Sequence, residues 1–342
     1  MSLTMKKPAE DVLVVGIDSK AQENENSKSN SEDSKVTTGG VNYFGCTRLI
    51  RDLVLLTMKI SFSIIFTAVR LLVPPSMKNL VGETVVITGA GRGIGREIAI
   101  KLATLGCIVV CWDIDEEANR STISKIIEEG GEAYGYLVDV SKRLEVRETV
   151  RMMRRNKVPE VTILINNAAV LIQRPFLEHS YEDVESTFGV NVLSNFWTIE
   201  AFLPTMLQNG SGHVVSMCSM CGMFGVSQKV AYCSSKYAVR GLMDSIREEL
   251  RLHPAKPKIN LTTIYPFYVA TGLAKDPQFR FPYIFRAVTA EYAAEEVIKA
   301  VRRNYTECTI PRCLFPLNSI IRLFPESAKL KILDFLSKEH RH

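Results

Sequence analysis

The stretch Val85-Val86-Ile87-Thr88-Gly89-Ala90-Gly91-Arg92-Gly93-Ile94-Gly95 decides the fold of this chain. Its β-branched residues predict a strand, and the glycines that follow predict a tight turn. A helical pattern then covers residues 93–105. Glycines let the backbone approach a phosphate closely, and the helix N-terminus offers free N–H groups. The stretch therefore predicts a pyrophosphate-binding turn that opens a βαβ unit.

The same alternation of strand and helix continues over residues 80–310. Helical patterns, such as those at 93–105 and 181–207, separate short β-type runs. The spacing predicts an α/β fold with one Rossmann-type, doubly wound parallel sheet of about seven strands. A hydrophobic helix is expected to precede it. The expected strands are 83–88, 107–112, 133–138, 161–165, 213–217, 258–264 and 307–311.

The composition of the chain excludes several classes of protein and partner. The chain has 342 residues, of which 46% are hydrophobic and 23% are charged, and this excludes a disordered or fibrous protein. A net charge of +5, from 42 Lys and Arg against 37 Asp and Glu, does not favour nucleic acid as a partner. The 8 cysteines have no framework spacing, which indicates a reduced, cytosol-facing compartment. We read Cys218-x-x-Cys221 as structural thiols, and we expect no metal site.

The N-terminal part predicts a polar, disordered tail over residues 1–48 and a membrane-anchoring helix over residues 49–75. Residues 53–73 are dominated by apolar side chains and are long enough for a helix to cross about 30 Å of hydrocarbon. Lys59, Ser63, Thr67 and Arg70 share one helical face, which suits an interfacial helix. A spanning helix and a helix buried in a core remain alternatives.

The C-terminal extension, residues 311–342, carries two apolar patches. It is read either as a second membrane contact or as a lid over the site. His213 precedes a strand and has no acidic partner in sequence, so we expect an ordinary core or surface histidine.

Asp113 directly follows the second predicted strand. A carboxylate there can accept hydrogen bonds from an adenosine ribose 2′-OH and would repel a 2′-phosphate, which favours NAD over NADP. Arg92 in the glycine turn attracts phosphate and leaves NADP open. The alternative for Asp113 is a helix N-cap.

Tyr232 and Lys236 stand one helical turn apart on one face. An ammonium nearby stabilises a phenolate, so we expect a lowered pKa for Tyr232 and proton exchange with an alcohol or carbonyl. Ser219, just beyond the fifth strand, can hydrogen-bond the substrate oxygen. Asn191 lies in a long apolar helix where asparagine is unfavourable, which indicates a polar role such as holding a relay water.

These residues, with Asn166-Asn167-Ala168, resemble the short-chain dehydrogenase/reductase family over about residues 80–310. The resemblance implies hydride transfer with NAD(P), Tyr232 as acid and base, Lys236 on the nicotinamide ribose, Ser219 on the substrate and Asn191 in a proton relay. Ala169 and Phe267 stand where most of the family has glycine. The implied cofactor-binding residues are Gly89, Gly91, Arg92, Gly93, Ile94, Gly95, Asp113, Asp139, Asn166, Tyr232, Lys236 and Thr271.

Finer motifs, including Val110-Cys111-Trp112-Asp113-Ile114 and Ala201-Phe202-Leu203-Pro204, are similar to a membrane-associated branch of that family. The branch contains epidermal retinol dehydrogenases, retinol dehydrogenase 10 and 17-beta-hydroxysteroid dehydrogenases of types 11 and 13. It implies a retinoid, steroid or other lipid alcohol as substrate, a homodimer, and the endoplasmic reticulum or lipid droplets as location. Aromatic residues at 276–285, with Met220, Met223, Phe224 and Phe267, are expected to line a hydrophobic substrate site.

Two other functions remain open at this point. One is a nucleotide-binding membrane scaffold with little turnover. The other is a soluble dehydrogenase of a polar metabolite, which would require residues 53–73 to be core.

Overall fold

The computed structural model describes residues 43–273 and 287–336. The chain divides into two compact units, Met1–Val69 and Arg70–His342. The predicted aromatic segment at 276–285 and most of the predicted polar tail lie outside the described residues.

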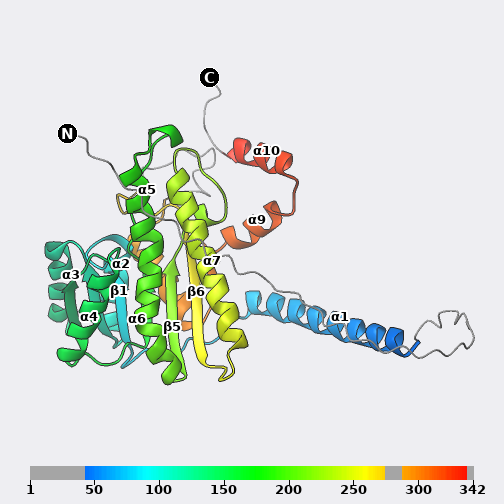
Figure 1. Cartoon of the computed structure of the whole chain (residues 1–342), viewed down its shortest axis with the longest axis horizontal. Helices are drawn as coiled ribbons and strands as arrows, with labels where there is room; N and C mark the ends of the chain where they lie inside the picture. Colours follow the sequence, from blue (N-terminus) through cyan, green and yellow to red (C-terminus); the bar gives the residue numbers. More distant parts are fainter. Residues whose placement is uncertain (1–42, 274–286, 337–342) are drawn as a thin grey trace, which may run out of the picture. The chain divides into compact units, whose positions relative to one another are not determined.

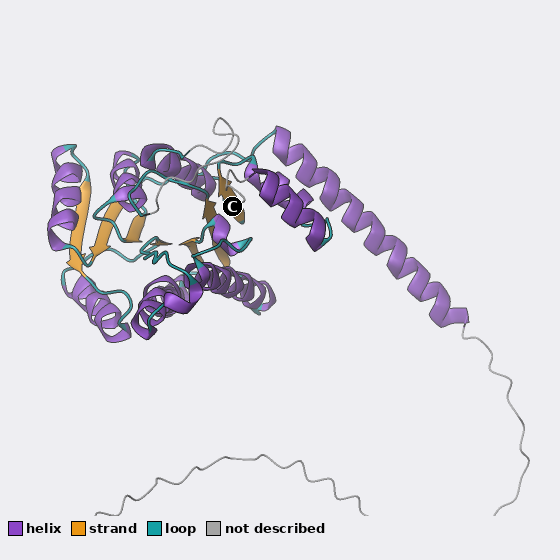
Figure 2. Ribbon diagram, turned by 90° about the horizontal axis from the view of Figure 1, so that it is seen from above, coloured by secondary structure: helices purple, strands orange, loops and turns teal. Residues whose placement is uncertain are grey.

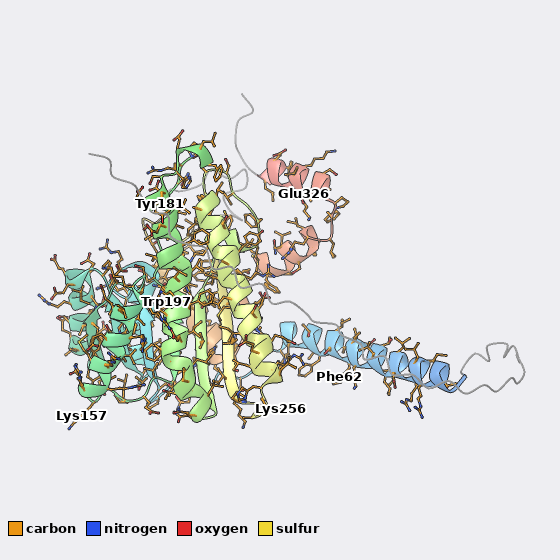
Figure 3. All side chains as sticks on the ribbon, viewed as in Figure 1. Phe62, Lys157, Tyr181, Trp197, Lys256 and Glu326 are labelled. Atoms are coloured by element: carbon orange, nitrogen blue, oxygen red, sulfur yellow. The ribbon has the colours of Figure 1, made fainter. Side chains whose placement is uncertain are left out.

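The first element is a long helix, α1 (Tyr43–Leu72). It begins at Tyr43, so residues 43–48, which were assigned to the tail, are helical instead. It ends before Pro74, as expected. Its apolar side chains are exposed rather than buried in a core; Phe62, labelled in Figure 3, is 70% exposed and Leu53 is 52% exposed. Within the described part of the chain, none of the helices has both the length and the apolar character that crossing a bilayer requires.

Seven parallel strands form one sheet in the order β3-β2-β1-β4-β5-β6-β7, which confirms the predicted fold class (Figure 1). The apolar strands are buried on both faces, as expected for a sheet covered on both sides. The bounds differ from the predicted ones by one or two residues. They are β1 (Thr84–Thr88), β2 (Ile108–Asp113), β3 (Glu132–Leu137), β4 (Ile163–Asn166), β5 (Ser211–Met217), β6 (Lys258–Pro266) and β7 (Glu307–Ile310).

Helices cover both faces of the sheet, and Figure 2 shows them on either side of the strands. Val85 and Ile87 point to one face, and Val86 between them points to the other, so each face has its own core. The first core packs against α2 (Gly93–Thr104), α3 (Glu116–Glu128) and α8 (Ala290–Arg302). The second packs against α4 (Arg143–Arg155), α6 (Ser194–Gln208) and α7 (Val230–Leu252).

The helix expected at 181–207 is interrupted. It consists of α5 (Tyr181–Phe188), a π-helical segment (Gly189–Leu193) and α6. Single π turns inside helices are frequent at functional sites. Here the π segment contains Asn191, one of the predicted catalytic residues.

The strand order reverses beside β1, which has β2 on one side and β4 on the other. In such sheets ligands bind outside the carboxyl ends of the strands at this switch point. The last described residues form two short helices, α9 (Leu314–Ile321) and α10 (Glu326–Leu336).

Candidate active site

A cavity of about 1920 Å³ lies where the strands end. The loops that follow β1, β4, β5 and β6 contribute Gly89, Asn167, Ser219 and Phe267 to its wall. The switch point therefore holds a space large enough for a dinucleotide and a second molecule.

The glycine turn is shaped by two different requirements. Gly89 and Gly93 have φ values of 68° and 57°, a region that glycine enters without a Cβ penalty. Both line the cavity, as do Arg92 and Ile94.

Gly91 and Gly95 do not line the cavity, and close packing explains them. A Cβ on Gly95 would lie 2.1 Å from the carbonyl oxygen of Gly89. One on Gly91 would lie 2.9 Å from the Ala118 Cβ. These glycines let the start of α2 and the loop approach their neighbours, so they support the predicted phosphate turn indirectly.

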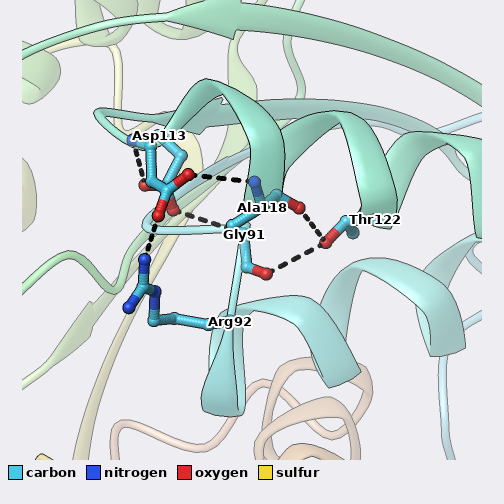
Figure 4. Close-up of polar contacts among 6 residues, drawn as sticks. Gly91, Arg92, Asp113, Ala118 and Thr122 are labelled. Atoms are coloured by element: carbon cyan, nitrogen blue, oxygen red, sulfur yellow. Dashed lines mark hydrogen bonds and ion pairs between the residues drawn. The ribbon is translucent and has the colours of Figure 1, made fainter.

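Asp113 stands at the end of β2 beside this turn, as Figure 4 shows. One carboxylate oxygen accepts the Gly91 N–H at 2.7 Å, and the other accepts the Asp115 N–H at 2.9 Å. Asp113 also lines the cavity. The alternative that Asp113 caps a helix is wrong, because Asp115 caps α3 by accepting the Ala118 N–H at 3.0 Å.

Arg92 forms an ion pair with Asp115 (Figure 4). The hydrogen bond from Ala118, followed by the charge of Arg92, lowers the pKa of Asp115. The guanidinium that could attract a 2′-phosphate is thus engaged by a carboxylate, and this adds to the repulsion expected from Asp113.

Asp139 follows β3 and lines the cavity. One of its oxygens accepts bonds from both the backbone N–H and the hydroxyl of Ser141, at 3.0 and 2.6 Å. Burial raises the pKa of Asp139, but the bonds from Ser141 and Lys142 outweigh it and leave the pKa lowered. The carboxylate is therefore ionised and held at the cavity wall, where the family resemblance implied a cofactor-binding residue.

The structure places Asn166 away from the cavity wall. This side chain ends β4 and turns into the helix layer, where its oxygen accepts the Thr198 hydroxyl at 2.7 Å, and it does not line the cavity. Its neighbour Asn167 does line it and donates to the carbonyls of Thr88 and Gly89, each at 3.0 Å. Asn167 was missed, although a residue just past a strand end is the better candidate for the switch point.

Ser219, Tyr232 and Lys236 all line the same cavity, so the structure brings together the groups predicted from sequence. The Lys236 ammonium donates to the Met217 carbonyl at 3.0 Å and lies 5.5 Å from the centre of the Tyr232 ring. The Ser219 hydroxyl oxygen accepts the Cys221 N–H at 3.1 Å, and Ser219 and Tyr232 share the cavity wall. A substrate oxygen can reach both hydroxyls from the cavity.

The predicted direction of the Tyr232 pKa is reversed. Burial raises the pKa of the phenol, the neighbouring Cys221 thiol adds to the increase, and the hydrogen bond from Ser219 opposes it. Burial also lowers the pKa of Lys236. Desolvation disfavours both charged forms, and it outweighs the attraction that was inferred from the four-residue spacing.

Asn191 is fully buried and lies beneath the catalytic groups rather than on the cavity wall. Its side chain accepts the Val170 N–H at 2.8 Å and donates to the Val170 carbonyl and the Ser235 hydroxyl, each at 3.0 Å. Ser235 in turn donates to the Tyr232 carbonyl at 2.7 Å. The chain of bonds joins the loop after β4 to α7, so the side chain of Asn191 positions Tyr232.

Several other predicted residues also reach the cavity. Thr271 lines it beside Gly93, and Ala169 and Phe267 occupy the wall where most relatives were expected to have glycine. Met220, Met223 and Phe224 line it as expected, together with apolar side chains of the C-terminal helices, Leu314, Leu317, Ile321, Leu330 and Leu336.

Cys218 and His213, which were not expected to take part in the reaction, have structural roles. Cys218 is buried, and its thiol donates to the Lys236 carbonyl at 3.1 Å. His213 is in the core; its ring nitrogens lie 3.1 Å from the Lys78 ammonium and 2.8 Å from the Thr262 hydroxyl. Burial, followed by the charge of Lys78, lowers the pKa of His213 to about 3, so the ring is neutral.

A parallel sheet with a glycine turn at its switch point is typical of dinucleotide-binding proteins. A family model described as short chain dehydrogenase matches residues 83–278. The chain is 40% identical over 242 residues to short-chain dehydrogenase/reductase family 16C member 6 of Bos taurus, covering 70% of this chain and 76% of that protein. The chain belongs to the short-chain dehydrogenase/reductase family and is an NAD(P)-dependent dehydrogenase.

Other relatives agree. The chain is 33% identical over 280 residues to epidermal retinol dehydrogenase 2 of Homo sapiens, covering 82% of this chain and 90% of that protein. A crystal structure of a short chain dehydrogenase/reductase from Burkholderia phymatum in complex with NAD is 26% identical, with a TM-score of 0.64, and the match covers 72% of this chain and 95% of that one. The family that the motifs indicated, and the branch of it that contains epidermal retinol dehydrogenases, are thereby confirmed.

Proposed function

We propose that this enzyme interconverts a lipophilic alcohol and its aldehyde or ketone, with NAD as the preferred cofactor, at a membrane surface. The observation that carries the proposal is the cavity itself. Ser219 and Tyr232 line its wall together with methionine, phenylalanine and leucine side chains. A substrate with a hydroxyl group on an apolar skeleton therefore fits both the polar and the apolar part of the wall.

The residues of the chain divide the chemistry among them. In reduction, the Tyr232 phenol, kept protonated by its raised pKa, donates a proton to the carbonyl oxygen while Ser219 holds that oxygen through a hydrogen bond. In oxidation the steps run in reverse, and Tyr232 accepts the hydroxyl proton in its phenolate form. The network through Asn191 and Ser235 holds the start of α7, and therefore Tyr232, against the loop after β4. When bound, NAD(P) supplies the hydride acceptor or donor, held by the glycine turn, Asp113, Lys236 and Thr271.

NAD is preferred because carboxylates outnumber cations in the part of the cavity where Asp113 is expected to meet the adenosine ribose. Asp113 lines that part of the cavity, and Asp115 pairs with Arg92. A 2′-phosphate would meet Asp113 and would have to break the Arg92 ion pair, whereas a 2′-hydroxyl can donate to a carboxylate.

The names of the relatives support the substrate class. They include an epidermal retinol dehydrogenase and estradiol 17-beta-dehydrogenase 11 of Rattus norvegicus, which is 33% identical over 291 residues. Retinol and estradiol are both apolar alcohols. Leucines of α9 and α10 line the cavity. This favours a lid over the site, and not a second membrane contact, as the role of the C-terminal extension.

Membrane association rests on α1. Its exposed apolar side chains would be covered if the helix lay in the lipid interface, with the stripe of Lys59, Ser63, Thr67 and Arg70 toward water. We place the enzyme at the endoplasmic reticulum or lipid droplets, facing the cytosol. We expect a homodimer formed through the helices that carry Asn191 and Tyr232, as the family resemblance implies.

A substrate panel tests the proposal. Retinol, steroid alcohols and long-chain fatty alcohols are offered to the membrane-bound full chain with NAD or NADP, and NADH or NADPH formation is followed. Turnover of at least one lipid alcohol, faster with NAD, is expected. Turnover of polar alcohols alone would refute the substrate class.

A truncation tests the location. A chain lacking residues 1–75 should move from the membrane to the soluble fraction and turn over lipid alcohols more slowly in the presence of vesicles. If the truncated and full chains partition and react alike, α1 is not an anchor.

A further inference from the structure

Lys229 directly precedes α7 and lines the same cavity as Ser219 and Tyr232. It is only 6% exposed, although lysine is rarely buried without a partner of opposite charge. The reaction described above gives it no part. A buried ammonium group therefore stands in the substrate cavity without an assigned role.

The contacts of Lys229 do not neutralise its charge. Its ammonium donates to the Tyr268 hydroxyl at 3.1 Å and lies 4.9 Å from the centre of the Tyr268 ring. In the part of the chain that the structure describes, no ion pair involves Lys229. Glu182 and Glu185 also line the cavity, but both are exposed residues of α5.

The start of α7 adds to the positive potential at this place. The first N–H groups of a helix carry partial positive charge, and the N-cap residue here, Lys229, offers them no acceptor. Moving an ammonium group out of water is costly unless a counter-charge replaces the lost hydration. A carboxylate that enters the cavity would supply that negative charge and would accept hydrogen bonds from the ammonium.

We propose that Lys229 and the start of α7 bind a carboxylate of the substrate, so that the enzyme acts on lipophilic alcohols that also carry an acid group. This inference deepens the proposed function and rests on it. Lys229, Tyr232 and Lys236 follow one another along α7 at intervals of three and four residues. With the cofactor at Lys236 and the reacting hydroxyl at Tyr232, the carboxylate lies on the side of Tyr232 away from the cofactor.

The apolar part of such a substrate has a place beside Lys229. The Tyr268 ring contacts the Phe267 ring edge to face, with 4.9 Å between the ring centres. Phe267, Met220 and Met223 line the cavity. A neutral alcohol would leave the ammonium without a counter-charge, and a small polar acid would leave the apolar wall uncovered. A lipid acid satisfies both.

Ligand binding tests the site without turnover. The probe is cis-parinaric acid, a fluorescent fatty acid that accepts energy from tryptophan, and its methyl ester is the neutral match. The chain has two tryptophans, and one of them, Trp112, lines the cavity. The full-length protein with NADH bound should bind the acid about 10–100-fold more tightly than the ester, as expected for hydrogen bonds to a charged group.

Lys229→Met removes the charge at a similar side-chain length and should bring the ratio of acid to ester affinity close to one. Lys125→Met, which changes an exposed lysine of α3, is the matched control and should keep the parental ratio. NADH titration of both variants checks that they are folded.

Kinetics connect the site to the reaction. 3-Hydroxydodecanoic and 12-hydroxydodecanoic acid are each compared with their methyl esters in the presence of NAD. For an acid that is turned over, Lys229→Met should raise KM by about 10–100-fold relative to its effect on the ester, with a smaller effect on kcat.

Two results would overturn the proposal. One is a parent protein that binds the acid and the ester equally, and this measurement holds even if the variant fails to fold. The other is a Lys229→Met protein that keeps the parental ratio of affinities. Acid-selective binding without turnover of any alcohol would instead contradict the proposed function, so the two failures are distinguishable.

Discussion

Gly95→Ala inserts one methyl group where the glycine turn has no space for it. The new Cβ would stand 2.1 Å from the Gly89 carbonyl oxygen and 2.5 Å from the Asn167 side-chain nitrogen. The backbone has to move to make room for the methyl group, because the nearest atom is a backbone carbonyl oxygen and not the end of a flexible side chain. Overpacking of this kind costs about 1–3 kcal/mol of stability.

Gly241→Ala is the matched control, because it adds the same methyl group to α7 with nothing within 4 Å. Alanine is favoured over glycine within a helix by about 0.8–1 kcal/mol. The same chemical change should therefore destabilise the protein at one position and stabilise it at the other.

Thermal unfolding and NADH titration measure both effects. At about 2–4 °C per kcal/mol, Gly95→Ala should lower Tm by about 2–12 °C, and Gly241→Ala should raise it by about 2–4 °C. Displacing the Gly89 carbonyl should also weaken NADH binding by at least about tenfold, or about 1.4 kcal/mol, whereas Gly241→Ala should leave it unchanged. A Gly95→Ala protein with parental Tm and NADH affinity would refute the close-packing argument.

Three further substitutions follow from the site and the core. Tyr232→Phe should lower kcat by about 10²–10⁴-fold and keep NADH affinity, whereas a scaffold function would tolerate it; parental turnover would remove Tyr232 from the mechanism. Asp113→Asn keeps an acceptor for the Gly91 N–H but removes the negative charge, so kcat/KM for NADP relative to NAD should rise by at least about tenfold, and an unchanged ratio would contradict the cofactor argument. His213 has a pKa lowered from 6.5 to about 3, so its contribution to stability is present above pH 6.5 and is lost as pH falls toward 3. His213→Gln should flatten the pH dependence of urea unfolding in that window. The control is His253→Gln, because His253 is only partly buried. An unaltered slope would show that His213 does not govern the pH dependence.

The local sequence determined the architecture. Short apolar runs and the helical patterns between them predicted seven parallel strands to within one or two residues, because strand and helix periodicities are properties of neighbouring residues. The same is true of the glycine turn and of Tyr232 and Lys236, which share a face whenever the segment is helical. Ser219 could also be placed in advance, because carboxyl ends of parallel strands gather at one edge.

Only the tertiary structure decided how these groups behave. The pKa of Tyr232 rises because distant segments exclude water from it, and the spacing to Lys236 carries no information about burial. Asn167, not Asn166, reaches the cavity because the strand's alternation turns one side chain toward α6 and the next toward the turn. Asn191 positions Tyr232 through Ser235, and Asp115 forms an ion pair with Arg92. These contacts join residues that are distant in the sequence and become close only in the folded chain. Local periodicity therefore set the elements, while desolvation and partner choice depended on residues that only folding brings together.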